Sequence, residues 1–300
     1  MNISSFKNAL DISGIGYKEN ESMALHTSFK IGGDADLFLI PDTAEKLSLS
    51  LKLARENGVP YFILGNGSNL LVSDGGIEGA VISTSALDSI KVIGNDIICG
   101  AGARLGSVCA AALESSLCGL EFAYGIPGSV GGALYMNAGA YGGEMKDAVL
   151  EAKCIDKDGN ILTVPLKDMD MSYRNSIFKS NGAVITEVTL RLAKGEKYEI
   201  KAKMDDFISR RKSKQPLEYP SAGSTFKRPQ GNFAGTLIEK CGLKGKNVGG
   251  AFVSEKHAGF VINKGGATAS DVLALVDIIK ETVFEKENVK LEKEIIFVGR

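Results

Sequence analysis

Arg174 and Ser224 are the residues whose sequence surroundings point most directly to chemistry. Arg174 lies in residues 173–176 (Tyr-Arg-Asn-Ser). A guanidinium beside an aromatic ring and small polar groups can hold a carboxylate through two parallel hydrogen bonds. Ser224 follows a glycine and shortly precedes Lys227 and Arg228, and this positive charge would favour loss of its hydroxyl proton. The structural alternatives are a surface ion pair for Arg174 and an ordinary turn for Ser224.

Two other charged segments allow both a functional and a structural interpretation. Residues 291–295 (Leu-Glu-Lys-Glu-Ile) place Glu294 just before a terminal apolar run, where its carboxylate either serves a site or is simply solvated. Residues 210–214 (Arg-Arg-Lys-Ser-Lys) end an expected helix, where positive charge either complements the helix dipole or binds a diphosphate. No aromatic residue interleaves with this run, which argues against a nucleic-acid surface.

Two glycine-rich segments, residues 65–69 and 119–143, have the composition of loops that approach a ligand closely. Glycine at high density costs backbone entropy, so either a ligand or close packing must justify it. Backbone N–H groups in such loops can bind diphosphate oxygens, and we predict a large, flat dinucleotide cofactor. The alternatives are tight turns between buried strands and, for residues 65–69, a turn facing solvent. The predicted cofactor-binding residues are Gly65, Asn66, Gly67, Ser68, Asn69, Pro127, Gly128, Ser129, Gly132, Asn137, Ala138 and Gly139.

Several well-known motifs are absent. Residues 65–70 lack the third glycine of Gly-x-Gly-x-x-Gly, and residues 242–246 have the wrong spacing for a P-loop. The five cysteines include no Cys-x-x-Cys pair, which argues against a zinc site and a disulfide framework. Two histidines are too few for a His-rich metal site and argue against a Ser-His-Asp hydrolase. We therefore predict no metal site.

Hydrophobic periodicity predicts the elements that must position these segments: apolar stripes along one face of each helix, and alternating inward and outward side chains in the strand at residues 184–192. Helices are expected over residues 42–57, 104–116 and 200–213, and from Thr268 or Ser270 to Lys286. Short strands are expected at 61–64, 81–82, 90–93, 97–98, 150–156, 161–164, 184–192 and 295–298. Short strands that alternate irregularly with a few helices predict an α+β fold.

Composition narrows the class of protein. The 300 residues suggest two or three compact units, and 44% apolar and 24% charged residues are typical of a globular protein. The net charge of −1 gives no basic field for nucleic acid. No apolar run approaches the roughly 18 residues of a membrane span. Residues 1–16 show no signal-peptide pattern, so we expect a cytoplasmic protein that binds neither nucleic acid nor membrane.

The motifs together resemble the UDP-N-acetylenolpyruvoylglucosamine reductase family of flavoenzymes, which acts in bacterial peptidoglycan precursor synthesis. Matching blocks occur in family order from about residue 26 to the end of the chain. The chain looks like the shorter of two family types, because no inserted loop with a site-closing tyrosine follows Arg174. The blocks are residues 26–36, 64–72, 125–132, 136–142, 173–176, 223–229 and 291–294.

The resemblance implies a fold and a cofactor. It implies an FAD-binding domain of the vanillyl-alcohol-oxidase (PCMH) type with two α+β subdomains, residues 1–84 and 85–196. A smaller α+β substrate-binding domain, residues 197–300, would follow, with its last strand (294–300) near the active site. Covalent attachment in this fold uses His, or His with Cys, and neither occurs in the glycine loops, so we expect non-covalent FAD.

The resemblance also implies roles for individual residues. The catalytic residues would be Arg174, Ser224 and Glu294. NADPH would reduce FAD and leave, and hydride would then pass to C3 of the enolpyruvyl ether of UDP-N-acetylglucosamine. Arg174 and Glu294 would stabilise the resulting negative charge, and Ser224 would protonate C2. The predicted substrate-binding residues are Tyr173, Lys214, Lys227 and Arg228.

Two alternatives to this reductase remain at the level of sequence. One is a PCMH-type flavin oxidase that passes electrons to oxygen. The other is a flavin-free sugar-nucleotide-binding protein. For the reductase we expect a monomer or a weak dimer.

Overall fold

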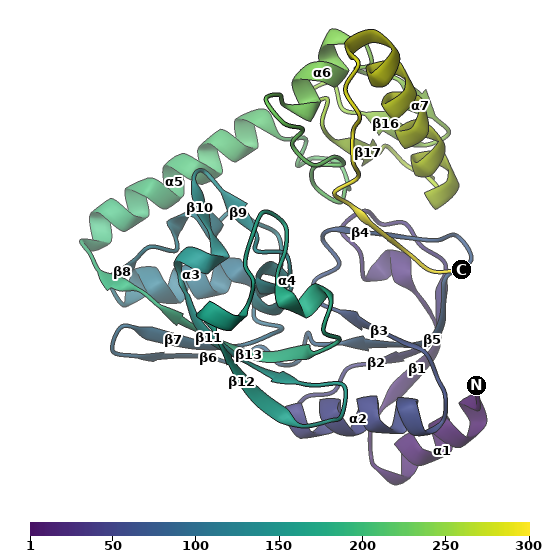
Figure 1. Cartoon of the computed structure of the whole chain (residues 1–300), viewed down its shortest axis with the longest axis vertical. Coiled ribbons are helices and arrows are strands. Elements are labelled where there is room, and N and C mark those ends of the chain that lie inside the picture. Colours follow the sequence, from purple (N-terminus) through teal and green to yellow (C-terminus); the bar gives the residue numbers. More distant parts are fainter. The chain divides into compact units, whose positions relative to one another are not determined.

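The computed structural model describes all 300 residues, which pack into two compact units (Figure 1). Both units mix helices and strands, which confirms the predicted α+β class. None of the helices is both long enough and apolar enough to span a bilayer. The three functional regions implied by the resemblance stay a prediction, because these units are defined by packing alone. The first unit contains Met1–Lys18, Leu37–Asn66 and Gly79–Arg211, and the second contains Glu19–Asp36, Gly67–Glu78 and Lys212–Arg300.

Two helices near the N-terminus help to form one apolar core of the first unit. Buried leucine and phenylalanine side chains of α1 (Ile3–Ile12) and α2 (Ala44–Glu56) pack with β2 (Asp34–Leu39). Thr43 caps α2 by accepting from the amide of Lys46, so the helix begins at Ala44, two residues after the start predicted at residue 42. β2 belongs to a sheet of order β1-β2-β5-β3, in which β3 and β5 are parallel. The other strands are β1 (Tyr17–Ser22), β3 (Tyr61–Leu64) and β5 (Ile77–Ser83).

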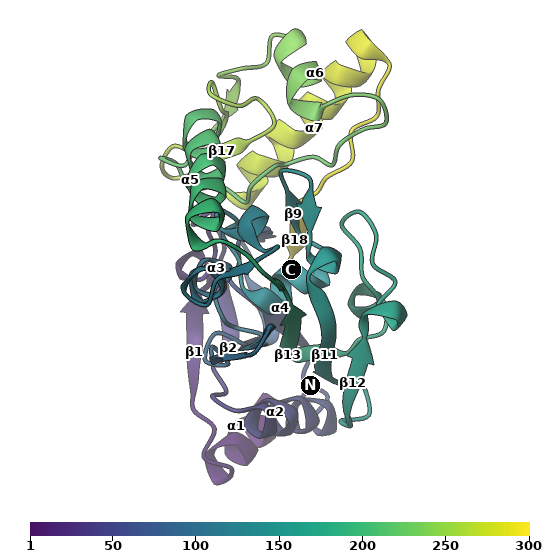
Figure 2. The same cartoon turned by 90° about the vertical axis from the view of Figure 1, so that its left-hand side faces the viewer.

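A five-stranded antiparallel sheet, of order β12-β11-β13-β7-β6, forms the rest of the first unit's framework. Figure 2 shows β11, β12 and β13 side by side. The alternation predicted for residues 184–192 holds in the second half of β13, where Val188 and Leu190 are buried and Arg191 is exposed, but Ile185 on the opposite face is buried as well. The strands are β6 (Ile90–Ile93), β7 (Asp96–Gly100), β11 (Val149–Ile155), β12 (Ile161–Pro165) and β13 (Val184–Arg191).

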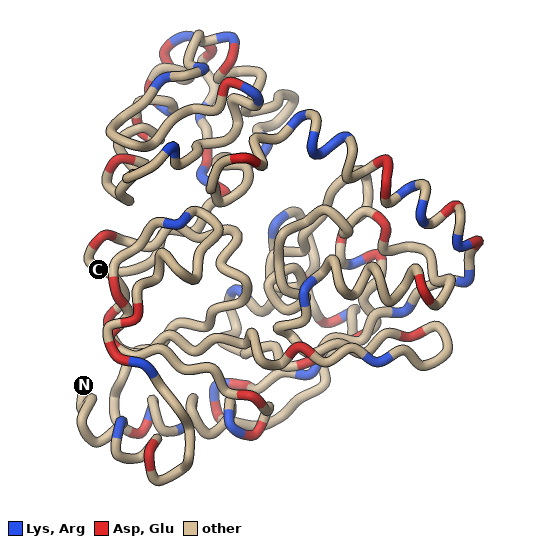
Figure 3. Tube along the Cα trace, turned by 180° about the vertical axis from the view of Figure 1, so that it is seen from behind, with Lys and Arg blue, Asp and Glu red and all other residues tan.

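Three further helices contribute to the first unit's second core. α3 (Leu105–Glu114) buries the predicted stripe that includes Val108 and Cys109. α4 (Val130–Tyr135) lies within the glycine-rich segment, where no helix was predicted. α5 (Lys197–Lys214) is longer than predicted and buries Ile200 and Met204. Figure 3 shows charges of both signs along α5, where Lys201 pairs with Asp205 and Arg210 with Asp206.

The second unit is built around one long helix, α7 (Ala269–Glu287). The predicted stripe is buried in its core: Val272, Leu275, Val276, Ile279 and Val283. A short helix, α6 (Ala234–Lys240), packs against α7. An antiparallel sheet of order β15-β16-β17 comprises Asn247–Val248, Ala251–Val253 and Val261–Asn263. β4 (Leu70–Val72) pairs in parallel with β18 (Ile296–Val298).

The remaining elements are short. β8 (Leu117–Cys118) pairs with β14 (Ala193–Lys194), and β9 (Gly139–Ala140) pairs with β10 (Gly143–Glu144). Five 3-10 turns complete the fold: Met23–Leu25, Glu121–Ala123, Met145–Asp147, Leu166–Asp168 and Ile177–Lys179.

Asp74 joins the loop after β4 to the start of α7. Its carboxylate accepts from the amides of Ala269 (2.7 Å) and Ser270 (2.9 Å), and from the Ser270 hydroxyl (2.7 Å). Burial raises the pKa of Asp74, but these hydrogen bonds outweigh it and hold the pKa below its usual value. The charged form is therefore the one that stabilises the helix start.

We expect Asp74→Ala to lower the free energy of unfolding by about 1 kcal/mol, the cost of losing a helix cap. Ser270→Ala is the matched control, because it removes only the hydroxyl bond and should cost less. Urea denaturation of the three proteins at neutral pH tests this, and equal stability of Asp74→Ala and the natural chain would contradict it.

Candidate functional site

The first unit brings the two glycine-rich segments together. A Cβ added to Gly65 would lie 2.6 Å from the Ser129 Oγ and 3.9 Å from the backbone of Gly132. Both residues come from the segment predicted to share a cofactor with Gly65, while Gly132 is itself exposed. A side chain at position 65 would therefore collide with the second bend, so glycine is required there for the two bends to pack against each other.

Ser129 organises the second bend. It is 2% exposed, and its Oγ accepts from the amide of Gly132 (3.3 Å), so it caps α4. The amide of Gly131 donates to the carbonyl of Ala101 (2.8 Å), and a Cβ at Gly131 would lie 2.8 Å from the Cβ of Ala101. Close packing thus explains why position 131 is a glycine. It does not explain the glycine at position 132, where an added Cβ would have only Ser129 as a neighbour within 4 Å. Pro127 is exposed and Gly128 is half-buried beside this cap.

The first bend continues into the second unit, which contains Gly67, Ser68 and Asn69. Gly67 has a φ of +60°, and a Cβ there would lie 2.0 Å from the carbonyl oxygen of His26. The fold therefore requires glycine at position 67. Asn69 donates through Nδ2 to the carbonyl of Glu294 (3.2 Å), which ties this bend to a predicted catalytic residue.

Asn137 is held entirely by protein groups. Its Nδ2 donates to Glu144 Oε2 (2.5 Å) and to the carbonyl of Ser172 (3.0 Å), and its Oδ1 accepts from the amide of Lys146 (3.0 Å). Its backbone amide also donates to the carbonyl of Leu134 (3.0 Å), so only its backbone carbonyl is left for the predicted cofactor role. The bond to Ser172 connects the glycine-rich segment, which includes the half-buried Ala138 and Gly139, to the turn that carries Arg174.

Arg174 lies in a tight turn of the first unit with a left-handed backbone, φ +55°. Ser172 and Asn175 exchange both backbone hydrogen bonds across the turn (3.2 and 3.0 Å). The guanidinium lies over the Tyr173 ring, 5.0 Å from its centroid, and Tyr173 is 53% exposed. A left-handed conformation is costly for arginine, and functional sites commonly contain such residues.

Ser224 and Glu294 belong to neighbouring segments of the second unit. The amide of Glu294 donates to the carbonyl of Thr225 (2.9 Å), and Phe226 pairs with Lys293 in an antiparallel bridge. Ser224 is exposed and Glu294 is half-buried. The predicted hydroxyl and carboxyl are therefore carried by segments that backbone pairing holds side by side.

The predicted substrate-binding cations have protein contacts in the structure. Lys227 Nζ lies 3.1 Å from Glu292 Oε2, and the Arg228 guanidinium lies 4.0 Å from the centroid of the Phe233 ring. Lys214 is the last residue of α5 and is exposed. Both Lys214 and Arg228 belong to the second unit.

Sequence reasoning missed a cluster around Arg211 in the first unit. Tyr141 stacks on Phe207, with ring centroids 4.6 Å apart and an interplanar angle of 3°. The Arg211 Cδ lies 3.1 Å from where a Cβ of Gly125 would be, and burial lowers the pKa of Arg211. The sequence presents Arg211 only as part of a basic run, and no local pattern links it to Gly125 or Tyr141.

His257 is linked to the segment of Ser224 through the backbone of Gly259. Its Nδ1 accepts from the amide of Gly259 (3.1 Å), and the carbonyl of Gly259 in turn accepts from the amide of Thr225. Burial lowers the pKa of His257 below its usual 6.5, with Lys244 lowering it further and Glu239 opposing.

The stability of the fold should therefore depend on pH through His257. Below pH 6.5 the unfolded chain binds a proton more readily than the folded one, so the free energy of unfolding should fall as pH decreases towards the lowered pKa. His257→Asn keeps an acceptor for Gly259 but does not titrate, and we expect a flatter pH dependence. Urea denaturation between about pH 7.5 and 5.5 measures both, and parallel curves would contradict the expectation.

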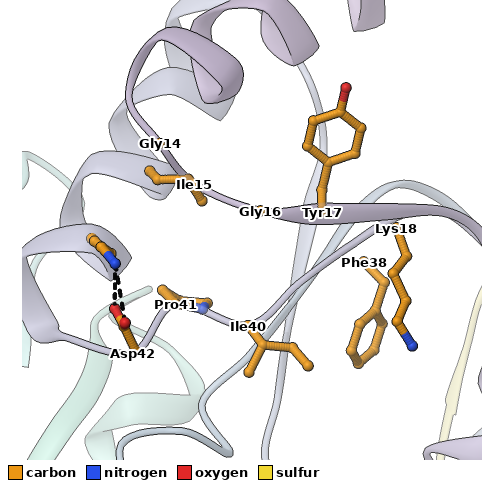
Figure 4. Close-up of a pocket in the computed structure, with 10 residues that line it drawn as sticks. Gly14, Ile15, Gly16, Tyr17, Lys18, Phe38, Ile40, Pro41 and Asp42 are labelled. Atoms are coloured by element: carbon orange, nitrogen blue, oxygen red, sulfur yellow. Dashed lines mark hydrogen bonds and ion pairs between the residues drawn. The ribbon is translucent and has the colours of Figure 1, made fainter.

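A hollow of notable size lies elsewhere in the first unit (Figure 4). Its volume is about 310 Å³. Its lining comes from the loop after α1, the start of β1, the end of β2 and the residues just after β2, with Lys46 and Asp42 forming an ion pair at one side. No predicted site residue lines this hollow, so it is separate from the candidate functional site.

Comparison with known proteins gives two family-model matches. Residues 35–165 match a model described as FAD binding domain. Residues 215–298 match a model described as UDP-N-acetylenolpyruvoylglucosamine reductase, C-terminal domain. Together the two matches include most of the predicted site residues.

Relatives and a solved structure agree with these matches. The chain is 54% identical over 282 residues to the UDP-N-acetylenolpyruvoylglucosamine reductase of Clostridium novyi (strain NT), covering 94% of this chain and 92% of that protein. It is 53% identical over 278 residues to the enzyme of the same name from Clostridium perfringens (strain SM101 / Type A), covering 93% and 91%. The crystal structure of UDP-N-acetylenolpyruvylglucosamine reductase from Thermus caldophilus is 36% identical, with a TM-score of 0.81 over 94% of this chain and 98% of that one.

Proposed function

Because the chain belongs to the UDP-N-acetylenolpyruvoylglucosamine reductase family, we propose that it reduces the enolpyruvyl ether of UDP-N-acetylglucosamine to UDP-N-acetylmuramate, with FAD as cofactor and NADPH as electron donor. The extent of the match supports this, since it spans nearly the whole chain and its relatives. The matched FAD binding domain supports a flavin oxidoreductase, and the choice of NADPH is part of the proposal.

The glycine bends around Gly65 and Gly132 would hold FAD without a covalent bond. The observation that supports the fit is the exposed backbone at Gly132, where an added Cβ would meet only Ser129 within 4 Å, beside the bend that contains Gly65. The cofactor-binding set would be residues 65–69, Pro127, Gly128, Ser129 and Gly132, with the backbone of residues 137–139. Bound FAD supplies the hydride chemistry, and the protein supplies position and charge.

The reacting end of the substrate would meet three side chains. Arg174 would bind the substrate carboxylate through its planar guanidinium. Glu294 would assist in stabilising charge that develops there as the double bond is reduced. Ser224 would donate the proton to the carbon next to the carboxylate. The observation that carries this assignment is the backbone pairing that holds the segments of Ser224 and Glu294 together.

The nucleotide end of the substrate would be bound by cationic and aromatic groups. Lys214 and Arg228 would contact the diphosphate, with Lys227 and Tyr173 nearby. Lys227 would have to exchange its contact with the exposed Glu292 for the substrate. An ion pair between exposed side chains is worth little, so this exchange is inexpensive.

Anaerobic mixing tests the proposed reaction. Photoreduced protein is mixed with the enolpyruvyl ether of UDP-N-acetylglucosamine, and the flavin absorbance is followed. Rapid reoxidation of the flavin is expected. A flavin that stays reduced with the substrate and is reoxidised only when oxygen is admitted afterwards would favour a flavin oxidase, and a colourless protein indifferent to FAD would favour a sugar-nucleotide-binding role.

A further inference from the structure

Thr225 follows the proposed proton donor Ser224 directly and is hydrogen-bonded through its backbone to Glu294, the second proposed catalytic residue of this unit. Its amide donates to the carbonyl of Gly259 (2.9 Å), and its carbonyl accepts from the amide of Glu294 (2.9 Å). Ser224 is its direct neighbour in the chain. A displacement of Thr225 would therefore change the position of Ser224 relative to Glu294.

The side chain of Thr225 makes a third contact, with the first residue of β17. Its Oγ1 accepts from the amide of Val261 (2.9 Å), and the two residues are 2% and 1% exposed. Residues 220–225 run beside β17: the amide of Asn263 donates to the carbonyl of Pro220 (2.9 Å), and Ser221 bridges Ile262.

The chain turns outward at Gly223, which has a φ of +77° and where an added Cβ would meet no neighbour within 4 Å. The exposed Ser224 follows directly. The Thr225 hydroxyl therefore provides the acceptor for Val261 just after the point where the chain leaves β17. Through this hydrogen bond, the side chain of Thr225 attaches the chain to β17 again directly after Ser224.

We propose that Thr225 is a positioning residue for the reduction: its hydroxyl, bonded to the amide of Val261, fixes the placement of Ser224 relative to Glu294. This assignment rests on the proposed function, which gives those two residues their roles. Thr225 does not act on the substrate. It restrains the loop that presents the proton donor.

Removal of the hydroxyl alone tests the assignment. Thr225→Val keeps the shape of the side chain and leaves the buried amide of Val261 without its acceptor. The segment must then shift to recover a partner, and a displacement of about 1 Å at a catalytic group can cost about 100-fold in rate. Thr225→Ser keeps the hydroxyl and should keep the position.

The experiment measures both half-reactions of the FAD-loaded, full-length protein by stopped-flow absorbance. With Thr225→Val, we expect flavin reduction by NADPH within about twofold of the natural rate and reoxidation by the enolpyruvyl substrate about 10- to 100-fold slower. Thr225→Ser should restore reoxidation. Thr282→Val is the control in the same unit: it removes a hydroxyl bond to the carbonyl of Ile278 within α7, and both half-reactions should be unchanged.

The outcomes separate this assignment from the proposed function. Equal slowing of both half-reactions by Thr225→Val, or loss of bound flavin, would show a general packing role and overturn the assignment. Natural reoxidation rates in Thr225→Val would also overturn it, while leaving the proposed function intact. Failure of the natural protein to be reoxidised by the substrate would overturn the proposed function and the assignment together.

Discussion

Ser224→Ala is expected to leave flavin reduction by NADPH nearly unchanged and to slow reoxidation by the enolpyruvyl substrate by several orders of magnitude. The hydroxyl is exposed, and its segment is paired with that of Glu294. In the proposed mechanism it donates a proton to a substrate carbon and takes no part in the hydride transfer from NADPH to FAD. General acid catalysis alone accounts for about 10²- to 10⁴-fold.

Two companion variants make the Ser224 result specific. Ser224→Cys retains a proton donor and should recover part of the reoxidation rate. Ser221→Ala removes a hydroxyl from the same loop without touching the proposed proton donor, and its half-reactions should match those of the natural protein. If Ser224→Ala slows both half-reactions equally, Ser224 is not the proton donor.

Arg174→Ala and Arg174→Gly are both expected to reduce turnover by about 10²- to 10³-fold, the usual effect of removing one group that stabilises developing negative charge. Their stabilities should nevertheless differ. Position 174 has a φ of +55°, which costs alanine roughly 1–2 kcal/mol and costs glycine almost nothing. Arg174→Gly should therefore unfold at a higher temperature than Arg174→Ala.

Thermal denaturation and steady-state kinetics on the same preparations check both parts of the Arg174 prediction. A lower unfolding temperature for Arg174→Gly than for Arg174→Ala would show that the left-handed turn is not strained. Normal turnover in either variant would remove Arg174 from the proposed mechanism.

Elements with a strong periodic stripe could be predicted from the sequence. α7 carries both a complete apolar stripe and a Thr268–Asp271 capping box, and α2 begins at a threonine cap. α4 was missed because it has only six residues, two of them glycine, and it forms because Ser129 caps it and Gly131 packs on Ala101. Helix propensity argues against a helix there, and tertiary contacts override it.

The site was only partly accessible to prediction. The glycine bends suggested that Gly65 and Ser129 would meet, and they do so within the first unit. The sequence could not show that both polar atoms of the Asn137 side chain are hydrogen-bonded to other protein groups. Nor could it show that Thr225 links Glu294 to Gly259. These contacts join residues far apart in the chain, and no local pattern encodes them.

The pairing of β4 with β18 has a consequence for how the protein forms during synthesis. Leu70–Val72 leaves the ribosome long before its partner Ile296–Val298 is translated. Until then β4 lacks its neighbour, and Glu19–Asp36 and Gly67–Glu78 have no remainder of their unit to fold with. Completion of this unit must therefore wait until Ile296–Val298 has been made, and over the roughly 220 intervening residues the growing chain carries an unpaired apolar strand, a period in which chaperone protection matters.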